Sequence, residues 1–244
     1  MKVILQENKS SNYLLNKIAN ILLKREDLYD RVNIIKSAKV PIVKLVEKEH
    51  NYNFDISFNK FDGIKQLKEA EKAFDIYPEM KFLIIIAKCI LRQRDLHETY
   101  TGGIGSFLLF CMVLAFLREV RKDYFKSNRL HELQNMMLSE YLLKFLEFYG
   151  IKVDINLHQI IMQDGGSIVQ KNNQNSEYGF SLISPQDSTH DIGNASFRIK
   201  EIFNVFKNRF NFLTNYNFEE GESILKYLIN PSKNVFSYIK EKKN

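Results

Sequence analysis

The spacing of the apolar residues changes near residue 61, and this change limits the folds that the chain can adopt. Within 53–58 apolar and polar residues alternate, which is typical of a strand with one packed face and places Asp55 on the opposite, polar face. From 64 to 74 the apolar residues recur every three or four positions, as in an amphipathic helix. A strand-bearing segment followed by a helical one predicts an α+β fold. The packed face of the predicted strand carries Phe54, Ile56 and Phe58.

The same patterns predict the other elements. In the first segment we expect strands over 3–5 and 40–46 and a helix over 12–23, whose packed face carries Leu14, Leu15, Ile18, Ile21 and Leu22. After residue 61 we expect helices throughout: one through 64–74 that stops before Pro78, then 80–91, 106–117, 138–149 ending at Gly150, 197–213 and 222–228. Residues 80–91 are apolar nearly all round, which predicts a buried central helix. The expected domains are 1–61 and 62–230, followed by a basic tail over 231–244.

Composition narrows the class of protein. The 244 residues are 45% hydrophobic, enough for a substantial core, and the longest apolar run, 107–117, is too short to span a bilayer, so no membrane is expected. Cys89 and Cys111 lie in apolar sequence, which favours free thiols and a reducing compartment. The net charge of +6 suits a polyanionic partner as well as it suits a solvated basic surface without function. The histidines show no metal-ligand spacing, so no zinc site is expected.

Two segments carry residues suited to phosphate chemistry. Residues 101–106 contain three glycines and open a predicted helix, where free backbone N–H groups and the helix dipole favour an anion. A plain helix cap is the ordinary interpretation of such a segment. Lys88 falls in the apolar stretch, where its ammonium needs either a partner or a path to solvent, and Arg92 follows one turn later on the same face. Asp55 by itself is more often a solvated strand residue than a metal ligand.

Three segments in order resemble one family: Asn-Phe-Asp-Ile-Ser-Phe-Asn at 53–59, Tyr-Thr-Gly-Gly-Ile-Gly-Ser at 100–106, and Ser-Pro followed by Thr-His-Asp-Ile-Gly within 184–193. Together they resemble the non-canonical poly(A) polymerases of the nuclear RNA-surveillance (TRAMP) type, within the DNA polymerase β-like nucleotidyltransferases. The resemblance implies that 1–61 form the distal part of a nucleotidyltransferase palm. Residues 62–230 would then form the mainly helical central domain with its PAP-associated segment.

The resemblance also implies roles for individual residues. Asp55 takes the position of the third carboxylate that holds Mg²⁺ or Mn²⁺. Ser106, presented by the turn of Gly102 and Gly103, takes the position of the serine that contacts the triphosphate. Phe107 stands where the family has a base-stacking tyrosine, so it keeps the ring and loses the hydroxyl.

Further roles come from the same resemblance. Lys88 and Arg92 would grip the triphosphate of ATP. Asn59 stands near the expected ribose position, with an ordinary turn asparagine as the alternative. His190 lies in the loop that reads the base edge, where the adenylating branch often has asparagine and some uridylyl-adding relatives have histidine.

The sequence departs from the family at several positions. Ser184 stands where an aspartate is usual and Asn194 where an arginine is usual, whereas 164–167 match a turn that we interpret as structural. The family's Gly-Ser signature and its first two aspartates, expected upstream of 53–59, have no counterpart in this chain. A truncated gene model or fragment explains their absence, and so does a pseudoenzyme that serves as a nucleotide- or RNA-binding scaffold.

The resemblance predicts a nuclear enzyme that adds nucleotides to RNA 3′ ends without a template, with AMP from ATP as the expected unit and UTP as the alternative substrate. A zinc-knuckle RNA-binding protein and an RNA helicase are its implied partners. An unrelated helical interaction domain is the third interpretation, and it would leave the order of the three motifs to chance.

Overall fold

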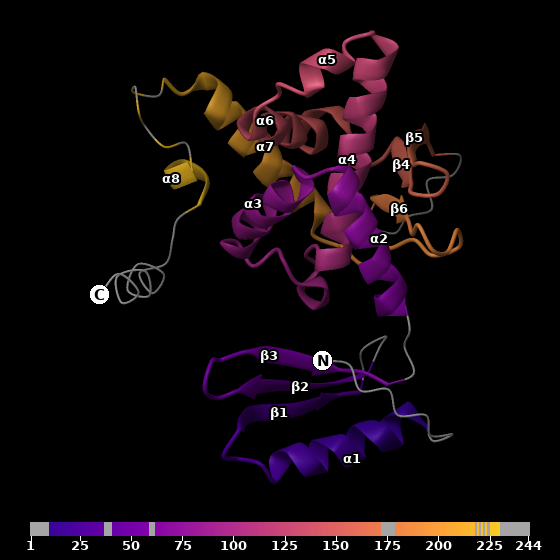
Figure 1. The fold of residues 1–244 in the computed structure, drawn as a ribbon, viewed down its shortest axis with the longest axis vertical. Helices are drawn as coiled ribbons and strands as arrows, with labels where there is room; N and C mark the ends of the chain where they lie inside the picture. Colours follow the sequence, from indigo (N-terminus) through magenta and orange to yellow (C-terminus); the bar gives the residue numbers. More distant parts are fainter. Residues whose placement is uncertain are drawn as a thin grey trace. The chain divides into compact units, whose positions relative to one another are not determined.

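The computed structural model describes residues 10–36, 41–58, 62–171, 179–217, 219, 221, 223 and 225–229. They form two compact units, divided between Glu69 and Ala70 (Figure 1). Helices and small sheets together make an α+β protein, so the predicted fold class is confirmed. The predicted domain boundary between residues 61 and 62 coincides with the start of helix α2 and stays a prediction.

The first unit is a three-stranded antiparallel sheet with one helix packed on it. Its elements are α1 (Ser11–Leu23), β1 (Tyr29–Ile35), β2 (Ile42–Glu47) and β3 (Asn53–Ile56), and the strand order is β1-β2-β3. Helix α1 begins where Ser10 accepts a hydrogen bond from the Tyr13 N–H, an ordinary N-cap. Its apolar face packs on the sheet through a small core of Leu15, Ala19, Val43 and Leu45. The sheet therefore has one covered face.

Several predictions for this unit are wrong in detail. Ile21 was placed on the packed face of α1 and Phe54 on the packed face of β3, but their side chains are 53% and 45% exposed, respectively. Each lies beyond the margin of the small core, which Ile18, Leu22, Ile56 and Phe58 complete. The strand predicted over 53–58 ends at Ile56. The strand predicted over 3–5 lies outside the described residues.

Strand β1 was not predicted, and its irregularity explains why. The pairing of β1 with β2 shifts between Asp30 and Asn33, and Arg31 has a φ of 52°. A bulge of this kind adds a residue to one strand, so side chains beyond it change faces relative to those before it. The alternation of apolar and polar residues that identifies a strand is therefore lost along β1.

The second unit is built around one long helix, α4 (Ser106–Lys126). Every residue of α4 from Leu108 to Leu117 is buried, so this helix is apolar on all sides and forms the centre of the core. Around it lie α3 (Met80–Arg92), α6 (Leu138–Glu147) and α7 (Ile199–Asn215) (Figure 1). The remaining helices are α2 (Asp62–Ile76), which runs across the division between the units, the short α5 (Leu130–Leu133) and α8 (Leu225–Leu228), the 3₁₀ turn η1 (Thr99–Thr101) and the π turn η2 (Phe148–Lys152).

An aromatic cluster joins α4, α6 and α7 inside this core. Phe145 contacts the rings of Phe116, Tyr149 and Phe206 edge-on, at centroid distances of 5.2 to 5.5 Å. The buried Tyr149 hydroxyl donates to the Met112 carbonyl at 2.7 Å, so its polar group is satisfied. Burial raises the pKa of Tyr149 well above its usual value, and the residue stays neutral.

Three predictions for the second unit need correction. A small sheet of β4 (His158–Ile161), β5 (Ser167–Gln170) and β6 (Ser181–Ile183), in the order β5-β4-β6, interrupts a region predicted to be entirely helical. Its strands have three or four residues, too few to show a period. Gly150 does not cap α6 but lies within η2, where an added Cβ would come within 2.5 Å of the Lys207 backbone N of α7. Helix α3 is not buried all round, because Phe82 and Ile85 are more than half exposed.

Among the described helices, none has both the length and the apolar character that crossing a bilayer requires. Neither Cys89 nor Cys111 is in a disulfide bond within the described part of the chain, in line with the prediction.

Candidate functional site

The glycine segment forms a tight turn that ends at the start of α4. After η1 the chain turns at Gly102, whose φ of 81° lies in the left-handed region that favours glycine. The Gly102 N–H donates to the Thr99 carbonyl at 3.0 Å, and the Gly103 N–H donates to the Glu98 carbonyl at 2.9 Å. Gly105 then occupies the N-cap position, and its side of the helix has no capping side chain. Among the described residues, no side chain caps α4, so its first N–H groups can donate to another acceptor.

Lys88 meets this helix end. The Lys88 Nζ donates a hydrogen bond to the Ser106 Oγ at 3.1 Å, and both side chains are exposed. The contact joins the middle of α3 to the first residue of α4. Lys88 therefore has a polar partner, and an ammonium, a hydroxyl and a helix N-terminus come together at one exposed point. All three can contact an anion, and the first and last attract negative charge.

Two further residues were predicted for this cluster, Arg92 and Phe107. Arg92 is exposed in the last turn of α3, one turn after Lys88. No hydrogen bond among the described residues joins the Arg92 side chain to Lys88 or Ser106. Phe107, predicted to stack on a base, is partly buried, and its ring already stacks on Phe110 at a centroid distance of 6.1 Å and an interplanar angle of 11°.

The loop that carries His190 is pinned to strand β6 by the residue that follows it. The Asp191 Oδ1 accepts hydrogen bonds from the N–H groups of Leu182 at 3.0 Å and Gly193 at 2.9 Å. The Ser184 N–H donates to the His190 carbonyl at 2.9 Å, which closes the loop. His190 itself is partly exposed. Asp191 therefore holds the backbone on both sides of the loop.

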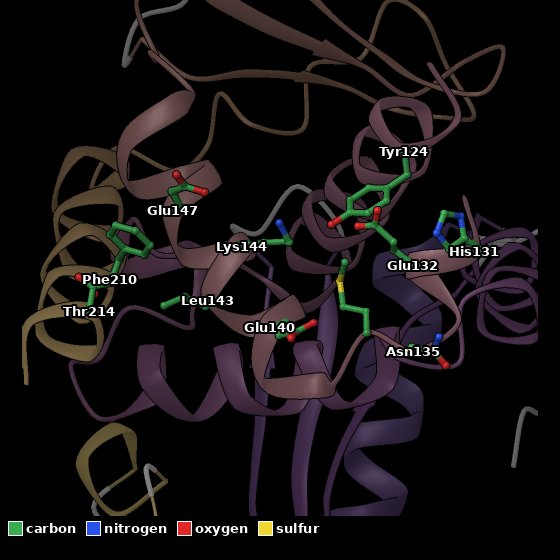
Figure 2. A pocket seen from close by; sticks show the side chains of 11 residues that line it. Tyr124, His131, Glu132, Asn135, Glu140, Leu143, Lys144, Glu147, Phe210 and Thr214 are labelled. Carbon is green, nitrogen blue, oxygen red and sulfur yellow. The ribbon is translucent and has the colours of Figure 1, made fainter. Parts of the chain in front are cut away.

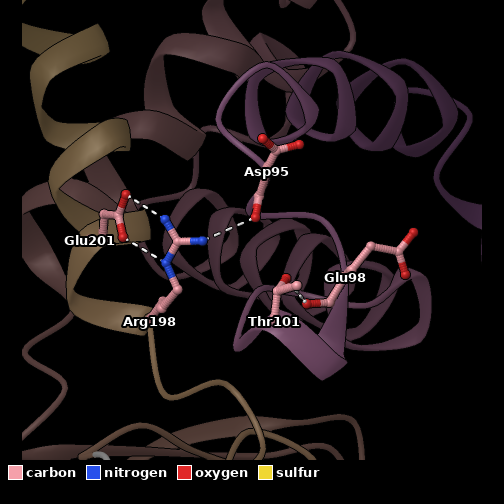
Figure 3. Close-up of polar contacts among 5 residues, drawn as sticks. All are labelled: Asp95, Glu98, Thr101, Arg198 and Glu201. Atoms are coloured by element: carbon pink, nitrogen blue, oxygen red, sulfur yellow. Dashed lines mark hydrogen bonds and ion pairs between the residues drawn. The ribbon is translucent and has the colours of Figure 1, made fainter.

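The end of this loop packs on the glycine turn, so the second and third motifs form one structure. The buried Ser196 Oγ donates to the Gly103 carbonyl at 3.0 Å, and the Arg198 N–H donates to the Gly102 carbonyl at 2.9 Å. The Phe197 ring occupies the space next to Gly102, where an added Cβ would lie 2.3 Å from it. Figure 3 shows the Arg198 guanidinium between the Glu201 carboxylate, at 2.8 and 2.9 Å, and the Asp95 carbonyl, at 3.1 Å.

Sequence reasoning missed this clamp. Residues 196–198 fall just beyond the last motif, and no local pattern shows which carbonyls they reach. One signal was present, since a glycine with no room for a side chain implies a close neighbour. The identity of that neighbour, some ninety residues later in the chain, was not recoverable from periodicity.

The candidate metal ligand lies in the first unit. Asp55 is exposed on β3, opposite Lys44 of β2 in the strand register. An exposed carboxylate is the oxygen donor that Mg²⁺ prefers, so the residue fits the predicted role, which stays a prediction. Asn59, predicted to lie near the ribose, is outside the described residues.

A second cluster of potential ligands, in the turn after β2, has a structural explanation. Glu47, Glu49 and His50 place their ligand atoms within 4.8 Å of one another. The Glu47 carboxylate already accepts the N–H groups of Glu49 and His50, at 2.5 and 2.9 Å. The hydrogen bond from the His50 N–H lowers the pKa of Glu47 and keeps it ionised. These contacts close the turn without a metal ion.

The cavity shown in Figure 2 lies elsewhere in the second unit, among α4, α5, α6 and α7. Its volume is about 680 Å³. Tyr124 at its edge is 18 residues along α4 from Ser106, which corresponds to about 27 Å of helix. None of the predicted site residues lines it. The cavity is lined by Tyr124, His131, Glu132, Asn135, Met136, Glu140, Leu143, Lys144, Glu147, Phe210 and Thr214.

Comparisons with known proteins point to poly(A) RNA polymerases both for the first 68 residues and for most of the chain. Residues 2–68 match the family model described as "Poly(A) RNA polymerase, mitochondrial-like, central palm domain". Poly(A) RNA polymerase CID14 of Cryptococcus neoformans is 32% identical over 206 residues, which make up 83% of this chain and 26% of that protein. The polymerase core of TRAMP, described as an RNA surveillance complex, superposes with a TM-score of 0.77 at 28% identity, over 93% of this chain and 75% of that one. The chain is thus similar to poly(A) RNA polymerases over most of its own length.

The predicted resemblance to these poly(A) RNA polymerases is therefore confirmed. Poly(A) RNA polymerase protein 1 of Saccharomyces cerevisiae extends the relation to 98% of this chain, at 27% identity, and is matched over 38% of its own length. The chain thus spans about a quarter to two-fifths of the length of these curated relatives.

Proposed function

We propose that this chain is part of a nuclear terminal nucleotidyltransferase that adds AMP from ATP to RNA 3′ ends without a template. The observation that carries the proposal is the contact of Lys88 with Ser106 at the exposed N-terminus of α4. Two residues from separate helices meet there, beside the first backbone N–H groups of α4. The poly(A) RNA polymerase names of the relatives support the reaction, and the RNA-surveillance description of the TRAMP core supports the setting.

The geometry suits the triphosphate end of a nucleotide. Lys88 supplies positive charge and the start of α4 supplies N–H donors. The Ser106 hydroxyl accepts from Lys88 and can still donate its own proton to a phosphate oxygen. Arg92, one turn away, would add charge to the same end of the nucleotide. Asp55 would hold a divalent cation, which in nucleotidyl transfer stabilises the attacking and leaving oxygens.

The protein would act together with an RNA-binding protein and an RNA helicase. A zinc-knuckle RNA-binding protein would supply RNA affinity, and a helicase would supply single-stranded 3′ ends. The net charge of +6 supports contact with RNA but identifies no particular RNA.

Lys88→Ala is expected to weaken ATP binding by about 10- to 100-fold, because a charge-assisted hydrogen bond of this kind contributes about 1.5 to 3 kcal/mol. Titration of this chain with a fluorescent ATP analogue and Mg²⁺ measures the effect. Lys81→Ala is the matched control, since Lys81 is also exposed on α3 but lies over the Phe74 ring at 5.2 Å. If both variants bind ATP as the parent chain does, Lys88 merely extends to solvent and the proposed triphosphate site is wrong.

His190→Asn is expected to shift the preference between ATP and UTP toward ATP by about tenfold, the value of one hydrogen bond of about 1.4 kcal/mol. Uracil offers an acceptor at O4 where adenine offers a donor at N6, so a donating histidine favours uracil, while asparagine adapts to either base. Competition between the two nucleotides in a protein that carries the upstream palm gives the ratio. His131→Asn, at an exposed histidine beside the cavity of Figure 2, is the control. An unmoved ratio would show that His190 does not read the base.

A further inference from the structure

We propose that Tyr100 and Phe197 form a stacking surface for the bases of single-stranded RNA beside the glycine turn. The inference rests on the proposed function, because it assigns the RNA strand a place next to the nucleotide site. Aromatic rings stack on any base, so such a surface suits an enzyme whose substrates share a 3′ end rather than a sequence.

Both rings are exposed at one place in the fold. The Tyr100 side chain is 79% exposed and the Phe197 side chain is 50% exposed. Single exposed apolar residues are common and carry no meaning. Here, however, Tyr100 lies in η1, two residues before Gly102, and the Phe197 ring covers Gly102 itself. Two large aromatic side chains from distant parts of the sequence therefore flank the same turn.

The turn holds its backbone in a fixed position. The Glu98 carbonyl accepts the Thr101 N–H at 3.3 Å and the Thr101 hydroxyl at 2.9 Å (Figure 3). It also accepts the Gly103 N–H at 2.9 Å. Arg198 ties the turn to α7 and to the Asp95 carbonyl. A backbone fixed before binding loses little further freedom when a ligand stacks on its side chains. The tyrosine is thus carried by a rigid support.

The charges around the turn favour a nucleic acid over a protein as the occupant. Exposed basic residues lie on or directly after both elements that approach it: Lys88 and Arg92 on α3, Arg94 just after it, and Lys200 at the start of α7. Three carboxylates are near the turn: Glu201 is bonded by Arg198, Glu98 lies 3.5 Å from the His97 Nε2, and Asp95 is exposed, so basic residues still outnumber them. Positive charge with interleaved aromatic rings is the pattern of single-stranded nucleic-acid surfaces.

A tryptophan reporter tests this proposal in the chain as it exists. The sequence contains no tryptophan, so Tyr100→Trp introduces a single fluorophore at the proposed surface. Phe125→Trp is the matched control, because Phe125 is 71% exposed in the last turn of α4, at the opposite end of that helix from the glycine turn. Each variant is titrated with oligo(A) at low salt and, separately, with ATP and Mg²⁺ alone.

We expect oligo(A) to quench the Tyr100→Trp emission and to leave the Phe125→Trp emission unchanged. We also expect Tyr100→Ala to weaken oligo(A) binding by about 5- to 100-fold, the value of one stacked base, with Tyr100→Phe restoring it. Equal quenching of both reporters, or quenching of neither, would overturn the proposal. Quenching by ATP alone to the same extent would also overturn it, since the ring would then belong to the nucleotide.

The same reporter separates this inference from the proposed function. Lys88→Ala in the Tyr100→Trp background should weaken binding of the fluorescent ATP analogue by about 10- to 100-fold and leave the quenching by oligo(A) in place. If ATP does not bind even the parent chain while oligo(A) still quenches Tyr100→Trp, the nucleotide site fails and the stacking surface stands.

Discussion

Asp55→Ala is expected to lower RNA extension by at least about 100-fold in a protein that carries this chain together with the upstream palm, because outer-shell residues that merely orient a metal ligand already cost up to that factor. Asp55 is exposed on β3, so its removal costs little packing. The loss should therefore appear in chemistry and not in folding. Extension of labelled oligo(A) by ATP with Mg²⁺ measures it.

Asp30→Ala is the matched control for this experiment. Asp30 is an exposed carboxylate on β1, in the same sheet, and its nearest basic partner is the adjacent Arg31 at 3.5 Å. Extension by this variant should stay within about twofold of the parent, since exposed ion pairs contribute little. Extension by Asp55→Ala at the parent's rate would remove Asp55 from the metal site.

Gly102→Ala is expected to lower the free energy of unfolding of the second unit by about 2 to 5 kcal/mol. The left-handed backbone costs a non-glycine residue about 1 to 2 kcal/mol, and displacing a packed ring costs about 1 to 3 kcal/mol more. The added Cβ would lie 2.3 Å from the Phe197 ring, so that ring must move. Urea unfolding followed by circular dichroism gives the change.

Gly165→Ala separates the two contributions. Gly165 has nearly the same φ, 85°, and an added Cβ there meets nothing within 4 Å. This variant should therefore lose only the backbone part, about 1 to 2 kcal/mol. If the two alanine variants are equally stable, the Phe197 ring moves without a measurable loss of free energy, and its packing against Gly102 does not stabilise the turn.

The sequence predicted the elements whose apolar period is regular. Helix α1 was expected over 12–23 and is found at Ser11–Leu23, and α3 was expected over 80–91 and is found at Met80–Arg92. Each has four turns or nearly so, long enough for its period to be unambiguous. The start of α4 was predicted at Ser106 because the glycines before it interrupt any helix.

Prediction failed where the local pattern was short or broken. Strand β1 contains a bulge, and β4, β5 and β6 have at most four residues each, so neither region shows a clear period of two. Helix α4 was expected to end at 117 but runs to Lys126, because its last turns are amphipathic while its first are buried on all sides. The continuous apolar run therefore predicted only the fully buried part of α4 and not its amphipathic C-terminal turns.

The amino-acid sequence by itself determined the fold class, the motifs and the family, since helical period, glycine positions and motif order are all local properties of the chain. Only the tertiary structure decided which residues meet. Lys88 reaches Ser106, and Ser196 and Arg198 clamp the glycine turn, through contacts between residues 18 to 96 positions apart. Such contacts depend on how helices pack around α4, and packing is set by the combined shapes of many side chains, which no single segment encodes.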